Sequence, residues 1–372
     1  MRFTMGLGGL EGLLRNLRSE GYTVLGPKLE DGVVRLSEVQ STDELARGIV
    51  DSQSPGQYRA RAAGDEIFSA VNGPLSVKNY LHPGEVAVAE IGRSGGKYGT
   101  EILLPGKRYA FLGVRPCDLA AVKVLDRSLL VEGFEEPTYA DLRKASLIIV
   151  VNCGRAGANC FCASMGTGPW AAGDYDIALT ELPDRFIVDL DGRFLPLFDG
   201  VGLAPAADKD LRDERDLRER VTAGMRKRIE SPDPAVGMYE GIDSPVWSEV
   251  AERCLACGNC TMVCPTCFCN TTKDITNLAD GTVTKVRSWE SCLSVDFTQN
   301  AGWNPRRERK ARYRQFVMHK FAYWTDQSGL YGCVGCGRCI TWCPVGIDIA
   351  ETVNSVLRKG QGSGVREAPR VG

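Results

Sequence analysis

The chain reads Cys254-Leu-Ala-Cys257-Gly-Asn-Cys260-Thr-Met-Val-Cys264-Pro265 and later Cys333-Val-Gly-Cys336-Gly-Arg-Cys339-Ile-Thr-Trp-Cys343-Pro344. Both stretches follow the pattern Cys-x2-Cys-x2-Cys-x3-Cys-Pro, in which three thiolates bind three corners of one iron–sulfur cubane and the fourth turns toward a second cubane. The pattern therefore predicts two [4Fe–4S] clusters with crossed ligands. One cluster would be held by Cys254, Cys257, Cys260 and Cys343, and the other by Cys333, Cys336, Cys339 and Cys264.

Zinc is the alternative to iron, because zinc also binds Cys-x2-Cys pairs. It needs four ligands per site, however, and rarely uses four cysteines in eleven residues followed by proline. Gly258 and Gly337 remove a side chain where the backbone must approach a cluster, which favours the iron–sulfur interpretation. Cys264 and Cys333 are separated by 68 residues, more than a compact β-type ferredoxin contains. We therefore expect residues 246–360 to form a mainly α-helical ferredoxin-type domain with two clusters.

Composition narrows the function further. Lys and Arg total 45 against 47 Asp and Glu, so no overall charge indicates a nucleic-acid partner. Fifteen cysteines and two histidines favour metal binding over disulfides and over histidine chemistry, and no residue is assigned as catalytic. Charges interrupt any signal sequence at the N-terminus, and the most apolar run, Leu147 to Val151, is too short to span a membrane. We expect a cytoplasmic protein.

Residues 1–235 read as a separate N-terminal domain of α+β or α/β class. Tyr109 to Val114 and Leu147 to Val151 are buried strands, and the segment between them is helical with Asp118 as a plausible N-cap. This order predicts two parallel strands joined by a crossover. Asp208 to Glu230 has near-helical spacing of apolar residues and predicts a surface helix. The segment from Ser231 to Pro245 reads as a linker.

The N-terminal domain contains four cysteines. Cys117 and Cys153 follow the two predicted strands, so both lie at the sheet edge where α/β proteins bind ligands, and the loop with Cys160 and Cys162 begins there. Four thiols suffice for a third iron–sulfur cluster, and Asp118 could replace one of them. The alternative is a set of buried, inert thiols, since free cysteine packs like a small apolar side chain.

Three cysteines remain in the C-terminal domain: Cys267, Cys269 and Cys292. They would either pack beside the clusters or join a site with a different ligand, and packing is favoured. The basic segment from Arg306 to Lys320 is either a solvated helix face, a dock for an acidic partner, or compensation for anionic clusters. It overlaps a helix expected between Pro305 and Trp324.

Shorter motifs predict local structure only. Asp191-Gly192 suits a hairpin turn within residues 185–195, and Gly92 to Gly99 indicates another hairpin loop. Gly6 to Gly12 is similar to a dinucleotide-binding fingerprint, but no strand is expected before it and its third glycine is displaced.

Five short segments of the chain are similar to segments of one protein family. They are Cys264-Pro-Thr-Cys-Phe-Cys269, Trp289-Glu-Ser-Cys292, Cys333-Val-Gly-Cys-Gly-Arg-Cys339, Gly113-Val-Arg-Pro-Cys-Asp118 and Cys160-Phe-Cys-Ala-Ser-Met-Gly-Thr-Gly-Pro169. The chain resembles the iron–sulfur beta subunit of cytoplasmic NAD(P)-linked [NiFe] hydrogenases of the sulfhydrogenase type, and also a related component of anaerobic sulfite reductase. The resemblance implies an electron-transfer subunit that links an FAD/NAD(P)-binding subunit to the small and large subunits of a [NiFe] hydrogenase. A sulfite or polysulfide reductase as the terminal enzyme, and a zinc-bound scaffold without electron transfer, are the alternatives.

Overall fold

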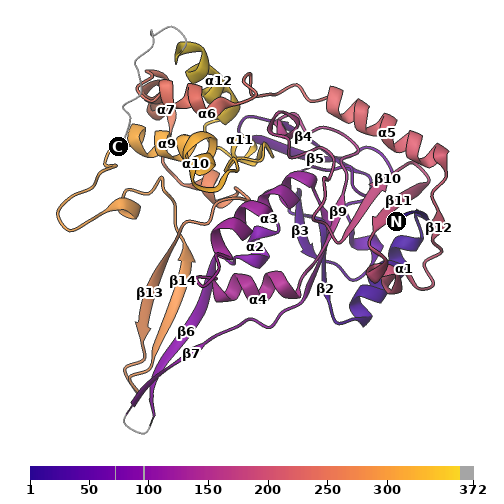
Figure 1. Ribbon diagram of the computed structural model, residues 1–372, viewed down its shortest axis with the longest axis horizontal. Coiled ribbons are helices and arrows are strands. Elements are labelled where there is room, and N and C mark those ends of the chain that lie inside the picture. The colour runs from indigo at the N-terminus through magenta and orange to yellow at the C-terminus, as the bar shows by residue number, and fades with distance from the viewer. Residues whose placement is uncertain (72, 95–96, 361–372) are drawn as a thin grey trace.

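The computed structural model describes residues 1–71, 73–94 and 97–360. Its largest element is an eight-stranded mixed sheet (Figure 1). In spatial order its strands are β12 (Ala204–Pro205), β1 (Arg2–Gly6), β11 (Arg185–Leu190), β10 (Ile177–Glu181), β9 (Leu147–Val151), β8 (Tyr109–Val114), β2 (Thr23–Glu30) and β3 (Val33–Glu38). The expectation of mixed sheet and helix in the N-terminal region is confirmed.

The two strands expected to be buried lie side by side in the middle of this sheet. β8 pairs with β9 in parallel, with Ala110 opposite Leu147, and α3 (Pro116–Leu129) and α4 (Pro137–Ala145) lie between them in the chain. Alternate residues of both strands pack against α1 (Gly9–Ser19) on one face and against α3 and α4 on the other. Burial on both faces explains why these strands are almost uninterrupted apolar runs.

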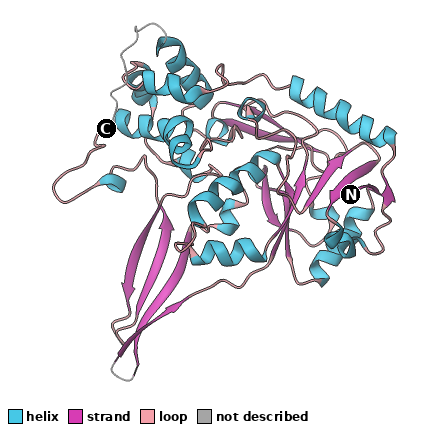
Figure 2. Cartoon of the chain, viewed as in Figure 1, coloured by secondary structure: helices cyan, strands magenta, loops and turns pink. Residues whose placement is uncertain are grey.

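A second sheet combines segments from both halves of the sequence. Its strands are, in order, β13 (Asn270–Thr276), β14 (Val283–Trp289), β6 (Glu85–Ser94) and β7 (Lys97–Ile102). β14 pairs antiparallel with β6, and the sheet projects away from the body of the molecule (Figures 1 and 2). The hairpin expected at Gly92 to Gly99 is confirmed in its strands, whereas residues 95–96 lie outside the described residues.

Helices surround the two cysteine runs. They include α6 (Pro234–Glu240), α7 (Val246–Arg253), α9 (Arg309–Met318), the π-helical segment His319–Tyr323, α10 (Trp324–Ser328) and α12 (Ile349–Gly360). Trp247, Met238, Phe321 and Val353 form the centre of their shared core. The helix expected near Pro305 to Trp324 is present, but β13 and β14 also belong to this part of the chain, so a mainly helical domain is not confirmed.

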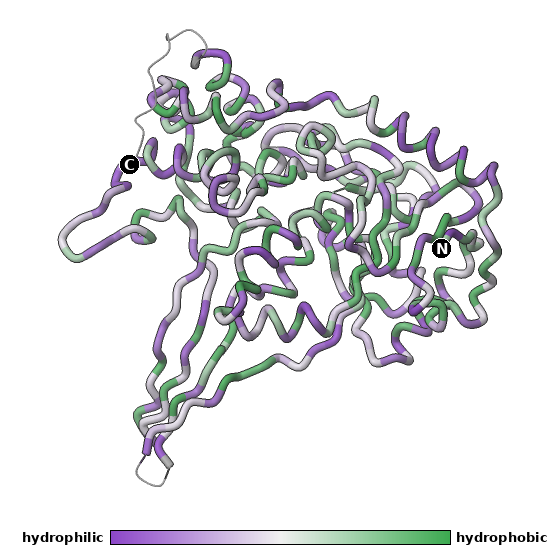
Figure 3. Tube along the Cα trace, in the orientation of Figure 1, coloured by the Kyte–Doolittle hydropathy of each residue, from purple (hydrophilic) through white to green (hydrophobic). Residues whose placement is uncertain are grey.

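The segment from Ser231 to Pro245 is not the extended linker that its composition suggested. It contains α6, whose Met238 is fully buried in the C-terminal core. Asp233 starts this helix, because its carboxylate accepts a hydrogen bond from the backbone N–H of Ala235. The helix expected before it is confirmed as α5 (Asp208–Ala223), which is mostly hydrophilic (Figure 3). The division of the chain into two domains stays a prediction.

Three local expectations are wrong. β11 ends at Leu190, and the Asp191 carboxylate accepts a hydrogen bond from the backbone N–H of Arg193, which starts the 3-10 helix η3 (Gly192–Phe198) instead of a hairpin turn. α3 begins at Pro116, so Asp118 lies in its first turn and is not the N-cap. No strand was expected before the glycine run Gly6 to Gly12, but β1 leads into it and pairs with β11. No helix in the described part of the chain is long and apolar enough to cross a membrane.

A buried ion pair joins the second cysteine run to the large sheet. Arg338, in the short helix α11 (Arg338–Thr341), donates to both carboxylate oxygens of Asp118 at 2.6 and 2.8 Å. It also donates to the carbonyl oxygen of Gly73 at 2.7 Å. Both charged side chains are almost completely buried, so each depends on the other for compensation of its charge.

Replacing Arg338 with methionine should therefore destabilise the chain by about 3–5 kcal/mol, because Asp118 would remain buried without its partner. The control is Arg358→Met, which removes an exposed pair with Glu230 at 2.6 Å and should cost at most about 1 kcal/mol. Thermal unfolding of the purified chains measures both. Equal effects of the two substitutions would contradict the importance of the buried pair.

Candidate iron–sulfur sites

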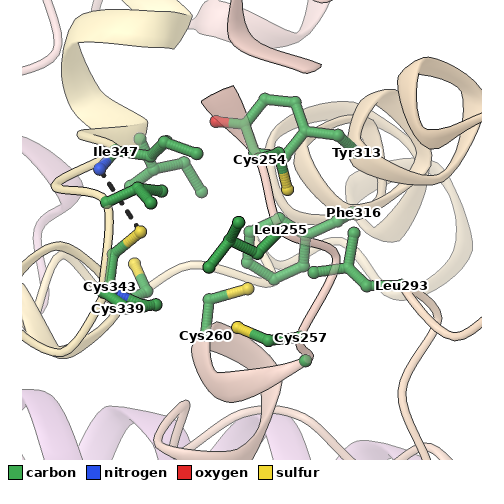
Figure 4. A pocket seen from close by; sticks show the side chains of 14 residues that line it. Cys254, Leu255, Cys257, Cys260, Leu293, Tyr313, Phe316, Cys339, Cys343 and Ile347 are labelled. Carbon is green, nitrogen blue, oxygen red and sulfur yellow. Dashed lines mark hydrogen bonds between the residues drawn. The ribbon is translucent and has the colours of Figure 1, made fainter. Parts of the chain in front are cut away.

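Cysteines from both runs line one pocket in the C-terminal region. Cys254 follows α7, Cys260 lies in the short helix α8 (Asn259–Met262) with Cys257 just before it, and Cys343 follows α11. Figure 4 shows their side chains arranged around the same space. The remaining wall is mainly apolar and includes Leu255, Leu293, Tyr313, Phe316 and Ile347. The four thiols that the crossed pattern assigns to one cluster are thus brought together.

The first cysteine of each run has the same local hydrogen bond. The backbone N–H of Ala256 donates to Cys254 Sγ at 3.3 Å, and that of Gly335 donates to Cys333 Sγ at 3.4 Å. Both donors have positive φ angles, 53° and 63°. The sequence repeat is therefore also a structural repeat, and the N–H groups would stabilise negative charge on the sulfurs.

The second set of cysteines lies next to the first. Burial raises the pKa of Cys339, and the nearby Cys333, Cys336 and Cys264 raise it further, as does Cys260 of the first set. Cys339 also lines the pocket of the first set (Figure 4). The crossed arrangement thus gathers Cys264 with the second run, and Cys260 and Cys339 lie where the two sets meet.

Bare thiolates are unfavourable in these positions. Burial raises the pKa of Cys333 to about 12 and also raises the pKa of Cys254 and Cys260. Positive charge from a metal centre would offset this cost, because a coordinating thiol is deprotonated by its metal. Among the described residues, no three Cys, His, Asp or Glu side chains converge as the ligands of a single ion do. Cysteine thiols in two adjoining sets are the donor groups that iron–sulfur clusters use.

A buried lysine accompanies Cys264. Lys320 donates to Cys264 Sγ at 3.2 Å, to Thr266 Oγ1 at 3.0 Å and to the carbonyl oxygen of Gly332 at 3.3 Å. A hydrogen bond with the Cys267 thiol lowers the pKa of Cys264 well below its usual range, and the Lys320 charge lowers it further, against the effect of burial. Cys264 therefore faces a buried cation, which favours negative charge on its sulfur.

The three additional cysteines lie around the same lysine. Cys267 lies near Cys264 and Cys269 near Cys292. Cys267, Cys269 and Cys292 line one pocket with Lys320. Sequence analysis favoured their packing beside the clusters. Their position next to a proposed ligand agrees with that interpretation, which stays a prediction.

A second buried lysine was missed by sequence analysis. Lys78 donates to the carbonyl oxygen of Met262 at 3.0 Å and lies over the ring of Trp289 at 3.7 Å. Burial lowers the pKa of Lys78 to about 8, and the nearby Cys267 opposes this shift. No sequence signal distinguishes Lys78 from a surface lysine, because its neighbours come from the distant C-terminal half.

The basic segment is only partly a solvated helix face. Arg312 is buried and donates to the carbonyl oxygens of Leu293, Arg306 and Arg307 at 2.8, 3.0 and 2.5 Å. Arg309 donates to the carbonyl oxygen of Cys254 at 2.9 Å. Arg309 and Lys320 thus bring positive charge to the cysteine runs, in agreement with the compensation hypothesis.

The four N-terminal cysteines are all buried, and Cys117, Cys160 and Cys162 lie beside Cys336 of the second run. Cys117 lies in the first turn of α3, Cys153 follows β9, and Cys160 and Cys162 lie in the next loop. Cys117 and Cys162 share an apolar cluster with Cys336. The carboxylate of Asp118 is already engaged by Arg338, so the expectation that Asp118 could serve as a substitute ligand finds no support.

Comparison with known proteins agrees with this geometry. Residues 253–347 match the family model of a 4Fe-4S dicluster domain. This part of the chain is therefore similar to domains that bind two [4Fe–4S] clusters, which supports electron transfer through iron–sulfur clusters.

A curated relative extends the match beyond that region. The chain is 29% identical to sulfhydrogenase 2 subunit beta of Pyrococcus furiosus over 352 residues, which cover 92% of this chain and 94% of the relative. The resemblance to the iron–sulfur beta subunits of hydrogenases is thereby confirmed across both halves of the chain. No solved structure matches.

The glycines beside the clusters allow a specific test. Gly337 begins α11 with a φ of 78°, and a Cβ placed there would lie 2.5 Å from the carbonyl oxygen of Asn159. Gly329 has a similar φ of 74° but would meet nothing within 4 Å. We expect Gly329→Ala to cost about 1–2 kcal/mol through backbone strain alone.

Gly337→Ala should cost about 1–3 kcal/mol more than Gly329→Ala, because the methyl group forces the second cysteine loop away from Asn159. It should also reduce bound iron. Thermal unfolding and iron analysis of anaerobically purified chains measure both effects, and identical results for the two variants would contradict the close packing.

Proposed function

We propose that this chain is the electron-transfer subunit of a multisubunit oxidoreductase and links an FAD/NAD(P)-binding subunit to a [NiFe] hydrogenase core by passing electrons between them. The observation that carries the proposal is the meeting of the two crossed cysteine sets at Cys260 and Cys339. Two centres so close together suit electron transfer through the protein. We assign no bond-breaking residue to the chain and do not regard it as an enzyme on its own.

We assign the ligands by the crossed pattern of the two runs. One [4Fe–4S] cluster has Cys254, Cys257, Cys260 and Cys343 as ligands, and the other has Cys264, Cys333, Cys336 and Cys339. The clusters supply one-electron redox chemistry. The chain fixes their ligands, excludes water with apolar side chains such as Phe316, and donates N–H groups to the sulfurs.

The first cluster is the candidate point of exchange with a partner protein. Of the fifteen cysteines, all of which are described, only Cys257 is exposed. The neighbouring Leu255 is 59% exposed, so an apolar side chain and a ligand lie together at the surface. A partner that covers both would shorten the path for an electron and remove apolar area from water.

The nature of the partners is inferred from the relative named above, which is a subunit of a sulfhydrogenase. We place the complex in the cytoplasm, where cysteines stay reduced. The direct test is anaerobic purification of the native complex from its source, followed by identification of the other chains and analysis of metals and cofactors. Nickel and a flavin subunit that bind with this chain would support the proposal.

Other compositions of the complex would overturn parts of the proposal. Siroheme without nickel would replace the hydrogenase core with a sulfite reductase. Stoichiometric zinc without iron, and no absorption near 400 nm, would remove electron transfer altogether and leave a zinc-bound scaffold.

Lys320 should set the reduction potential of the cluster that Cys264 binds. A charge-assisted hydrogen bond contributes roughly 1.5–3 kcal/mol, and its loss would affect the reduced, more negative state most. Lys320→Met should therefore lower one midpoint potential by about 60–130 mV for a one-electron couple. Anaerobic redox titration followed by electron paramagnetic resonance measures this shift.

The matched control is Lys320→Arg, which keeps the positive charge and should shift the potential much less. An unchanged potential in Lys320→Met, with both clusters present, would show that the lysine does not act on a cluster ligand.

A further inference from the structure

Four buried thiols lie outside the sites already assigned. Cys117, Cys153, Cys160 and Cys162 are between 3% and 8% exposed. They come from two neighbouring parallel strands, because Cys117 lies three residues after β8, and the other three follow β9. The carboxyl ends of parallel strands meet at one edge of a sheet, so the topology itself gathers these side chains.

The four thiols are close enough to affect one another. Cys117 and Cys162 pack in one apolar cluster, and Cys160 and Cys153 lie near enough to Cys162 to act on its charge. Such a group cannot hold several negative charges unless positive charge is supplied between them. Four thiolates are the usual complement of one cubane cluster.

An unsatisfied cation gives an independent indication of an anionic group. Arg115 is 5% exposed, and its Nη2 donates to the carbonyl oxygens of Phe68 and Ala70 at 2.5 Å each. Its Nη1 is buried and has no hydrogen-bond partner among the described residues. The guanidinium also lowers the pKa of Cys153, against the larger effect of burial. A buried donor without an acceptor is costly, and an anionic cluster beside Cys153 would supply one.

Glycines line the walls around these sulfurs. A Cβ at Gly157 would lie 2.8 Å from Cys160 Sγ, and one at Gly168 would lie 2.9 Å from Cys162 Sγ. Side chains at either position would occupy the space beside the thiols. The loop thus keeps open the surroundings that a bulky group bound to the sulfurs requires.

The thiol loop also contacts the second cysteine run directly. The backbone N–H of Phe161 donates to the carbonyl oxygen of Gly335 at 2.8 Å, and Thr167 Oγ1 donates to the carbonyl oxygen of Val334 at 2.7 Å. Cys160 Sγ lies 3.8 Å from the carbonyl oxygen of Cys336. Any redox centre at the N-terminal thiols would therefore neighbour the cluster assigned to the second run.

We propose that Cys117, Cys153, Cys160 and Cys162 bind a third [4Fe–4S] cluster, which lengthens the relay into the N-terminal sheet. The relay would then have three centres in a row, with the cluster of the second run in the middle. The inference extends the proposed function but uses different ligands, so the two can fail separately.

The test compares iron and acid-labile sulfide in three full-length chains that are reconstituted anaerobically with iron and sulfide. The wild-type chain should bind about 12 iron atoms, four for each cubane. Cys160→Ala/Cys162→Ala should bind about 8, and Cys254→Ala/Cys257→Ala, which removes ligands of the first cluster, should also bind about 8.

The outcomes separate the two proposals. About 8 iron atoms in the wild type, unchanged by Cys160→Ala/Cys162→Ala, would overturn the third cluster and leave the proposed function intact. Full iron in Cys254→Ala/Cys257→Ala would instead contradict the ligands of the proposed function. One zinc ion, lost only with the N-terminal cysteines, would also overturn the third cluster.

A second variant keeps the inference testable if the cysteine variants do not fold. Arg115→Met leaves all thiols in place, so it should retain about 12 iron atoms and lower the midpoint potential of a single cluster signal in an anaerobic redox titration. Arg143→Met is the control, because Arg143 pairs with Asp126 at 3.3 Å and is not among the charges that act on Cys153. Unchanged potentials in Arg115→Met would contradict a cluster beside this guanidinium.

Discussion

The structure depends on one electrostatic constraint: many thiols are buried where a free negative charge is not tolerated. Burial raises the pKa of Cys254, Cys260, Cys333 and Cys339. Neutral thiols would remove the charge, but the surroundings are arranged for anions. Backbone N–H groups point at Cys254 and Cys333, and Lys320 is buried against Cys264. Metal clusters resolve the conflict, since iron neutralises the thiolates and the remaining negative charge is met by these donors.

The same constraint explains how the two halves of the chain are joined. The second cysteine run must lie deep in the molecule, so its backbone packs against another backbone, with glycine at the points of closest approach. A Cβ at Gly335 would lie 2.7 Å from the backbone of Cys162. The carboxylate brought into this contact, Asp118, is neutralised by Arg338 from the cysteine run itself. The ion pair therefore fixes the position of the run without adding net charge beside the sulfurs.

Much of this arrangement could be predicted from local sequence patterns. The buried strands Tyr109–Val114 and Leu147–Val151 have the predicted bounds, because an apolar run buried on both faces is a strong local signal. The crossed grouping of the cysteines stays a prediction from the ligand spacing, and the structure brings Cys254, Cys257, Cys260 and Cys343 around one pocket. Asp118 is different: its partner is 220 residues away in the chain, and nothing nearby in the sequence separates a helix N-cap from half of a buried ion pair.

Other features depended on contacts between distant segments and could not be predicted. β13 and β14 carry many polar residues and complete a sheet begun by β6, so their pairing partner lies in the other half of the sequence. Lys78 is buried only because Met262 and Trp289 cover it. The helix α6 was read as a linker, since its proline and glycine content outweighed its short apolar face. Long-range burial decided each of these cases, and local propensity is a weak guide there.

The cysteines differ in their exposure to solvent, and this difference would affect how each centre exchanges electrons. Cys257 is exposed beside Leu255, Cys260 and Cys339 where the two sets meet are partly buried, and all four N-terminal thiols are buried. Apolar walls and exclusion of water favour the less charged state of a cluster, whereas nearby cations and N–H donors favour the more negative, reduced state. Lys320 acts on the second set and Arg115 lies beside the N-terminal thiols. The chain thus places positive charge beside buried sulfurs, and such charge favours the reduced state of a cluster bound there.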